Sequence, residues 1–411
     1  MRGTPGRHAG REPVDRSISS TFLRWTFARA LFHRGYVLAS GLYFVINAHL
    51  SGYQLLILAT VMAITLLLSD IPFGVWSDAF SRKWPLVIGH VFLAAGMVLT
   101  GLVTAFPLLL VTQVLWGLGW AFSTGADVAW VTDELDQPGL IARVLTARAR
   151  WDLIGGAVGM TAFGVLGWAI GLGTAIVITG AAMAVVGVFV ALRFREDNFT
   201  PAKAQKWKTS VSIFRRGLSL SRRDREVLLV LVATMLVNGA AMISWAFPKQ
   251  LVDRGFPSSP VLWYAALGIL SSGIGILALH FVEVRIEGVG VARRTYALSC
   301  FVGMLGLLVL AYAPKALEGS AGILVISGIT FNVTRTVSTV WINRRTPSDI
   351  RATMHSFLSQ AESVGEVAGG AALAGVASLW GIVPTIVASG LLVALAGVIV
   401  ARSRADRKVP C

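Results

Sequence analysis

Twelve apolar stretches, separated by short polar turns, run through almost the whole chain. A helix needs roughly 20 mostly apolar residues to cross the hydrocarbon core of a bilayer. Only 14% of the 411 residues are charged, against about a quarter in soluble domains. We therefore expect an all-α polytopic membrane protein with about twelve transmembrane helices in two six-helix halves. The expected spans are 22–46, 54–76, 85–106, 108–132, 150–171, 174–194, 227–248, 261–283, 295–313, 320–342, 354–378 and 382–401.

A polar, basic segment divides the twelve stretches into six and six. Residues 195–226 form this expected cytosolic linker, whose short amphipathic stretches would lie on the membrane surface. The two halves are expected to be six-helix bundles over 22–194 and 227–401. Residues 1–21 lack the apolar region of a signal peptide. We expect them to form a disordered cytosolic tail, with a second tail over 402–411.

The net charge of +15 follows the alternation of the turns. Basic residues gather in the linker and in every second turn, such as those at Arg82 and Arg344. The only lysines and arginines in the remaining turns are Lys249, Arg254 and Lys315. Loops rich in Lys and Arg stay in the cytoplasm, so both termini are expected to be cytoplasmic. The basic charge thus reflects topology and not nucleic-acid binding, and the Gly- and Ala-rich composition favours a bacterial inner membrane.

The turn between the second and third stretches reads Gly74-Val-Trp-Ser-Asp78-Ala-Phe-Ser-Arg82-Lys83. A glycine, an aspartate four residues later and then a basic pair resemble the loop signature of the major facilitator superfamily. The preceding Asp70-Ile-Pro-Phe looks like the lead-in of many of its drug-efflux members. This chain departs from the signature in carrying alanine and serine where a basic residue and a glycine are usual.

The fourth stretch extends the resemblance, because it is rich in glycine and ends with Asp133 and Glu134. The resemblance implies the major facilitator fold, in which two six-helix halves rock about a central cavity. Charges at one helix end would then hold one face closed and release it as the halves move. The alternative is that they are ordinary interfacial charges. The residues of this expected cytosolic latch are Asp70, Gly74, Asp78, Arg82, Lys83 and Asp133.

Ionisable residues inside the apolar stretches are the candidates for proton coupling, namely Glu366, Asp127 and Glu362. Such groups cost roughly 2.5–3.5 kcal/mol at the centre of a helix on insertion scales, so each needs a reason to be there. Glu366 lies near the middle of its span, with Glu362 one turn away on the same face. A carboxyl group in a low-dielectric site can take up and release a proton near neutral pH.

Each of these charges also has a structural alternative, which for Glu366 is an ion pair buried between helices. Glu362 is expected to pair with Arg335, and Asp127 could pair with the basic latch residues Arg82 and Lys83. His33, in the first span, is expected to be the partner of a neighbouring carboxylate.

Polar and aromatic residues away from the membrane interfaces are candidates for a substrate cavity. Arg34 lies near the middle of the first span, cannot lose its proton, and would pair with an acid or an anionic substrate group. Trp116 and Trp120 are four residues apart on one helix face, where they could stack on an organic substrate. Their alternative role is to pack between helices or against lipid. The remaining candidates are Asn238, Trp245, Asn332 and Arg335.

No phosphate-binding loop of the ATP-driven kind occurs in the sequence. The leading hypothesis is a secondary transporter that works by alternating access and exports amphipathic small molecules or drugs in exchange for protons, as the resemblance implies. The alternative is a specific transporter of one metabolite or natural product, with an anionic group suited to Arg34. A membrane-embedded enzyme or a non-transporting sensor is a remote alternative.

Chemistry at a fixed site is not expected. The two cysteines, Cys300 and Cys411, form no disulfide framework and no zinc-binding spacing. His280 and Glu283 supply only half of a metal site. We therefore expect no catalytic residues, metal or cofactor. The expected partners are a small-molecule substrate, protons and the lipid bilayer, with the protein acting as a monomer.

Overall fold

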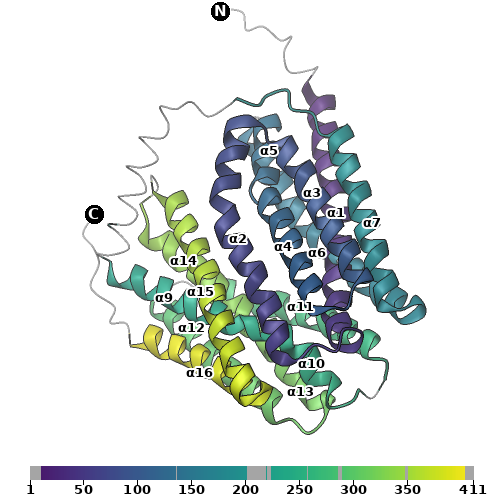
Figure 1. Cartoon of the computed structure of the whole chain (residues 1–411). Coiled ribbons are helices and arrows are strands. Elements are labelled where there is room, and N and C mark those ends of the chain that lie inside the picture. The colour runs from purple at the N-terminus through teal and green to yellow at the C-terminus, as the bar shows by residue number, and fades with distance from the viewer. Residues whose placement is uncertain are drawn as a thin grey trace, which may run out of the picture. The chain divides into compact units, whose positions relative to one another are not determined.

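The computed structural model describes residues 11–135, 137–200, 219, 224–256, 258–285, 289–347 and 350–402, and over these residues it is helical with no strands (Figure 1). The first six long segments are α1 (Arg11–Ile46), α2 (Gly52–Phe80), α3 (Lys83–Leu102), α4 with α5 (Phe106–Ser123, Ala126–Leu135), α6 (Pro138–Ile170) and α7 (Leu172–Arg193). The second six are α9, η1 and α10 (Arg225–Ala241, Met242–Ala246, Phe247–Val252), α11 (Pro260–Arg285), α12 (Val289–Tyr312), α13, η2 and α14 (Ala316–Ile323, Leu324–Thr330, Phe331–Arg345), α15 (Arg351–Trp380) and α16 (Ile382–Ala401).

These segments confirm the predicted polytopic helical membrane fold. In the described part of the chain, eleven helical segments are long and apolar enough to cross a membrane, and α1, at 36 residues, is the remaining long helix. The expected disorder is wrong for residues 11–21, because α1 begins at Arg11, whereas their cytosolic location stays a prediction. Polar residues there extend an apolar helix instead of ending it. Most of the predicted linker lies outside the described residues.

Three of the long segments are interrupted near functional candidates. Between α4 and α5, Gly125 adopts a φ of 80°, a left-handed conformation that glycine reaches without steric cost. A short 3₁₀ turn, η1, separates α9 from α10. The segment η2 is a π-helix, a form that leaves α-helical hydrogen bonds unmade and is frequent at functional sites.

The chain divides into two compact units. Unit 1 consists of Met1–Tyr43 and Leu68–Lys203, and unit 2 of Phe44–Leu67 and Ala204–Cys411. The first half of α2 therefore belongs to unit 2 and its second half to unit 1. The predicted domain boundaries at 194 and 227 stay a prediction.

Glycines bring the helices of unit 1 into backbone contact. A Cβ atom on Gly159 of α6 would lie 2.0 Å from the carbonyl oxygen of Leu31 on α1. Likewise, a Cβ atom on Gly89 of α3 would lie 2.8 Å from the carbonyl oxygen of Gly119 on α4. The helices of this unit run side by side in Figure 1. Small residues of this kind are the usual way in which membrane helices approach closely.

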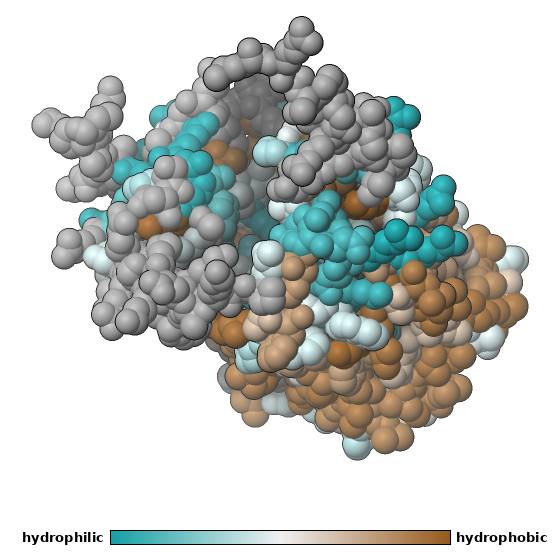
Figure 2. All heavy atoms as spheres, turned by 90° about the horizontal axis from the view of Figure 1, so that it is seen from above, coloured by the Kyte–Doolittle hydropathy of each residue, from teal (hydrophilic) through white to brown (hydrophobic). Residues whose placement is uncertain are grey.

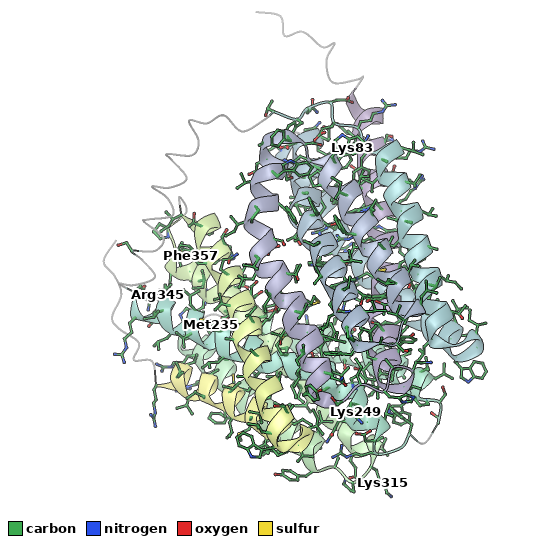
Figure 3. The ribbon with its side chains drawn as sticks, in the orientation of Figure 1. Lys83, Met235, Lys249, Lys315, Arg345 and Phe357 are labelled. Carbon is green, nitrogen blue, oxygen red and sulfur yellow. The ribbon has the colours of Figure 1, made fainter. Side chains whose placement is uncertain are left out.

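Unit 2 is packed in the same manner. A Cβ on Gly369 of α15 would lie 2.2 Å from the Cα of Gly239 on α9, so these two helices touch along their backbones. Figure 3 shows Arg345 near one end of this unit and Lys249 and Lys315 at the other. The basic turn after the tenth span and the two sparsely charged turns thus lie at opposite ends, as the sequence predicts.

The surface is divided between polar and apolar regions. Figure 2 views the molecule from above. It shows hydrophilic residues gathered at the end that faces the viewer and apolar residues along a flank. Exposed leucine, valine and tryptophan side chains occur on most of the long helices, such as Leu192, Leu305 and Trp380. With no water inside a bilayer, helices satisfy their own backbone hydrogen bonds. The chain is a multi-pass membrane protein.

Candidate functional site

A buried ion-pair centre lies in unit 1, where three of its helices meet. The Asp127 side chain on α5 is only 3% exposed. Its Oδ2 atom is 2.5 Å from Arg148 Nη2 on α6 and 3.7 Å from Arg29 Nη1 on α1. The alternative pairing of Asp127 with Arg82 or Lys83 is therefore wrong, because the aspartate in the first turn of α5 faces α1 and α6.

An aromatic wall adjoins this centre. The rings of Trp116 and Trp120 on α4 lie nearly parallel with centroids 5.6 Å apart, which confirms that they share a face. His33 on α1 covers both, at 5.5 Å from Trp116 and 4.7 Å from Trp120. Tyr36 continues the wall at 6.3 Å from Trp116. His33 was expected to partner a carboxylate, which is wrong because its ring is stacked between α1 and α4.

Arg29 joins the ion-pair centre to the aromatic wall. Its guanidinium carbon lies 4.8 Å from the Trp120 ring centroid and 5.1 Å from that of Trp25. Cations within about 6 Å of a tryptophan ring centroid are attracted by its electron-rich face. Sequence reasoning placed Arg29 in the first span but did not single it out. The available signal was its spacing, since Trp25, Arg29 and His33 recur every four residues and share one helix face.

Three nitrogen atoms along this wall are buried without a hydrogen-bond partner. They are Arg29 Nε, His33 Nδ1 and Trp116 Nε1. An unmade hydrogen bond in a buried group costs about 1–3 kcal/mol, and most buried polar groups in folded proteins have a partner. These atoms therefore provide hydrogen-bonding capacity that a polar ligand or water could use.

Arg34, the first-span residue that the sequence favoured, lies one turn beyond this centre. It is exposed, and its side-chain carbons lie against α6, where a Cβ on Gly156 would be 3.1 Å from Arg34 Cγ. Unit 1 thus pairs two arginines, at 29 and 148, with one buried aspartate, while Arg34 lies apart from them against α6.

Part of the predicted latch assembles at one end of unit 1. Arg82 is hydrogen-bonded to Asp78, and its Nε atom is 3.3 Å from Asp133 Oδ2. The Lys83 side chain lies instead over its neighbour Trp84, with its Nζ atom 5.7 Å from the ring centroid. Figure 3 shows Lys83 at that end of the unit.

The other two latch candidates lie on α2, away from these contacts. Asp70 is half-buried, and a Cβ on Gly74 would meet no atom within 4 Å. Close packing therefore does not require a glycine at position 74.

Glu196 completes the latch cluster and was missed from the sequence. It accepts a hydrogen bond from Ser81 Oγ at 2.7 Å and from the backbone N–H groups of Arg82 and Lys83. These amides belong to the first turn of α3, where a carboxylate is favoured by the helix dipole. Ser81 occupies the position where the family signature usually has glycine, and a hydroxyl at that position was the available signal.

Unit 2 contains a more open ion pair. Arg335 Nη2 on α14 is 3.4 Å from Glu362 Oε2 on α15, which confirms the predicted pairing. The arginine side chain is 74% exposed, and that of the glutamate 18%. Glu366 lies one turn further along α15 and is half-buried.

The remaining candidates of unit 2 make local contacts. Asn332 Nδ2 donates to the carbonyl oxygens of Ser327 and Gly328 at 2.8 and 3.0 Å, and so stabilises the π-helix. Asn238 donates to the Thr234 carbonyl one turn back. Trp245, in η1, is partly buried against the core of this unit.

A buried acid at one end of unit 2 was also missed. Glu226, in the first turn of α9, is 5% exposed. Its carboxylate forms an ion pair with Arg345 and accepts a hydrogen bond from Trp341 Nε1 at 3.2 Å. Sequence reasoning assigned this acid to the linker boundary, where hydropathy gave no sign of burial.

No group of three or more potential metal ligands occurs among the described residues. His280 is exposed on α11, and the side chain of Glu283 lies outside the described part. The residues that unit 1 gathers are arginines, an aspartate and aromatic rings. These groups suit ion pairing and the binding of an organic molecule better than metal ligation.

Comparison with known proteins identifies the family. Residues 17–369 match the Major Facilitator Superfamily. Among solved structures, the nucleoside transporter NupG superposes with a TM-score of 0.76 at 15% identity, covering 94% of this chain and 100% of its own. The peptide transporter POT gives 0.71 at 13%, covering 98% and 95%. A bacterial homologue of the human lysosomal transporter Spinster gives 0.69 at 15%, covering 95% and 97%.

No curated protein matches the chain. At these identities the solved structures show the fold alone, whereas the family match covers most of the sequence. The chain belongs to the Major Facilitator Superfamily, a family of membrane transporters.

Proposed function

We propose that this chain is a secondary active transporter that works by alternating access and exports amphipathic small molecules in exchange for protons. One observation carries the proposal: Arg29 contacts both the buried Asp127 carboxylate and the ring face of Trp120. Arg29 therefore links the proposed coupling carboxylate to a surface suited to organic molecules.

The coupling step starts at Asp127. A proton on this carboxylate removes the negative charge that holds Arg148 and Arg29. Arg29 then loses its ion pair and keeps only its contacts with the tryptophan rings. Because Arg29 stays charged, it shifts toward the rings or toward a substrate group lying on them. Loading a proton and binding a substrate thus act on the same guanidinium.

Glu366 and Glu362 on α15 are the second pair of proton-coupling candidates. Glu362 already has a basic partner in Arg335, and Glu366 lies one turn from it on the same helix face. The two units would then each contribute a carboxyl group. The resemblance to drug-efflux members of the family supports export. The basic turns support cytoplasmic termini, and the Gly- and Ala-rich composition supports a bacterial inner membrane.

The cluster around Arg82 provides the conformational part of the proposal. Its bonds to Asp78 and Asp133 tie the turn before α3 to the end of α5. Ion pairs at an exposed helix end are each worth less than about 1 kcal/mol, so they can break and re-form during a transport cycle. Arg82 therefore acts as a reversible latch.

A second candidate is specific transport of one anionic organic molecule. It is favoured by the excess of arginine in unit 1, where Arg29 and Arg148 pair with Asp127 and Arg34 lies five residues beyond Arg29 on α1. Arg34 is exposed and has no ion pair among the described residues, which leaves it able to bind a carboxylate or phosphate group.

The test is proton movement in liposomes. The purified protein is reconstituted with a trapped pH dye, a proton gradient is imposed, and lipophilic cations and anions are added. Asp127→Asn, Glu366→Gln and Arg34→Ala are compared with Asp253→Asn, a control at an exposed turn paired with Lys249. Binding is followed separately by tryptophan fluorescence.

We expect several unrelated compounds to dissipate the gradient, and Asp127→Asn to abolish this while binding survives. Loss in Glu366→Gln instead would assign coupling to unit 2. A response to one anionic compound alone, lost in Arg34→Ala, would establish the specific transporter. If no compound moves protons through any variant, proton coupling is wrong.

A further inference from the structure

A groove on unit 1 between α1 and α7 lies beside the proposed transport site and shares Trp25 with it. It has a volume of about 380 Å³, and its walls are apolar apart from one arginine. The residues that define this α1–α7 groove are Arg24, Ala28 and Phe32 on α1 and Ala182, Val186 and Phe189 on α7.

The groove runs along the helices. From Arg24 to Phe32 and from Phe189 to Ala182 there are eight and seven helical steps, which at 1.5 Å per residue correspond to about 11–12 Å. One leaflet contributes about half of the roughly 30 Å hydrocarbon core. The apolar walls are therefore long enough to hold most of one acyl chain.

Two arginines lie at one end of the groove. Arg24 lines its wall and is exposed. Arg193, in the last turn of α7, is exposed and is spaced so that it continues the face formed by Ala182, Val186 and Phe189. Neither arginine forms an ion pair with any residue that the structure describes.

This charged end coincides with the end of α7. Phe194, which follows the helix, contacts the ring of Trp25 at 5.8 Å, so Arg24 and Arg193 belong to the same level of the molecule. At a helix end, charged side chains lie in the headgroup region of a bilayer. The groove thus combines a basic mouth at headgroup depth with an apolar path into the membrane.

We propose that the α1–α7 groove binds an anionic phospholipid from the leaflet at this end of unit 1. Arg24 and Arg193 hold the phosphate, and one acyl chain lies between Ala28, Phe32 and the opposing face of α7. Guanidinium groups suit phosphate because they donate two parallel hydrogen bonds. By the positive-inside rule this is the cytoplasmic leaflet, which carries the anionic lipids.

The distribution of charge favours a lipid over a helix from a second copy of the chain. The charge is one-sided, with arginine at one end and apolar walls beyond it, which matches an amphiphile.

The experiment measures lipid binding to the full-length protein, stripped of lipid in detergent, by native mass spectrometry. Phosphatidylglycerol and phosphatidylcholine with identical acyl chains are titrated. The variants are Arg24→Gln with Arg193→Gln, and Ala182→Phe, which fills the groove. Arg150→Gln is the control, because it removes an exposed charge from α6 without touching the groove.

We expect tighter binding of phosphatidylglycerol than of phosphatidylcholine. Each arginine near an anionic lipid contributes about fivefold in affinity, so the double variant should lose about 25-fold for phosphatidylglycerol and much less for phosphatidylcholine. Ala182→Phe should weaken both lipids, and Arg150→Gln neither. If the glutamine variant does not fold, Arg24→Lys with Arg193→Lys takes its place. This pair keeps the charge and should retain most of the binding.

Three results would overturn the proposal. Equal losses in Arg150→Gln would mean that only the general charge of the protein attracts the lipid. Full competition by inorganic phosphate would identify a site for a free anion. Unchanged lipid binding in Ala182→Phe, together with dissociation of a dimer, would assign the groove to a second copy. None of these readouts depends on transport, so they leave the proposed function untouched.

Discussion

The two units tie their fourth and fifth spans together with the same kind of ion pair but in different surroundings. In unit 1 the acid is on the earlier span and the base on the later one, as Asp127 and Arg148. In unit 2 the order is reversed, with Arg335 before Glu362. In the first pair the aspartate is buried and backed by Arg29, and Arg148 is 34% exposed, whereas the arginine of the second pair is 74% exposed.

This difference indicates which unit carries the more sensitive switch. Breaking a buried ion pair leaves an uncompensated charge in a low-dielectric site. In an exposed pair, water solvates the charge that remains. A proton on the unit 1 acid therefore has a large effect on its surroundings. A proton on the unit 2 acid disturbs a weaker bond, next to a π-helix that already departs from regular geometry.

The largest expected effect comes from breaking the buried pair. Arg148→Met leaves the buried Asp127 carboxylate with the longer ion pair to Arg29 and the Val128 backbone N–H. It should destabilise the protein by about 3 kcal/mol, the lower end for a broken buried pair. The measurement is thermal unfolding in detergent. The double variant Arg148→Met with Asp127→Asn should recover most of the loss. If it recovers none, the carboxylate charge does not cause the destabilisation.

A second prediction checks that helix packing is similar in the two units. Gly159→Ala pushes α6 against the Leu31 carbonyl, and Gly369→Ala pushes α15 against Gly239. Each should cost about 1–3 kcal/mol, the usual cost of overpacking. The control is Gly375→Ala on α15, where a Cβ meets no atom within 4 Å. If one unit tolerates the change and the other does not, the difference between units extends beyond their charges.

The π-helix of unit 2 gives a third, smaller effect. Asn332→Ala removes the side-chain hydrogen bonds to the carbonyls of Ser327 and Gly328, and the expected destabilisation is about 1 kcal/mol. Thr339→Ala on the same helix removes a single hydrogen bond to Arg335 and serves as the control. Hydrogen exchange of the η2 amides should rise in the first variant and not in the second. Equal protection in both would contradict a stabilising role for Asn332.

The smallest effect is expected at the exposed pair. Arg335→Ala should change the free energy of unfolding by less than about 1 kcal/mol, because exposed ion pairs contribute little. High salt should reduce even this difference between wild type and variant. A loss as large as that of Arg148→Met would show that the two pairs are equivalent and would remove the contrast drawn between the units.

Several features of the candidate site could be predicted because they depend on residues close in sequence. Trp116 and Trp120 share a face for the simple reason that four residues make about one helical turn. The pairing of Arg335 with Glu362 followed from charges at similar depths on consecutive spans. The same reasoning failed for Asp127, because depth suggested Arg82 and Lys83 while the rotation of α5 turned the carboxylate toward α1 and α6.

Taken alone, the sequence determined the number of helical segments, their approximate bounds and the family of the chain. Hydropathy, charge alternation and the Gly74–Lys83 motif are all written in consecutive residues. Only the tertiary structure decided that Arg29 reaches both Asp127 and Trp120, and that Glu196 joins Ser81 from 115 residues away. Such contacts depend on how each helix is rotated about its axis, which close glycine packing sets and local sequence does not encode.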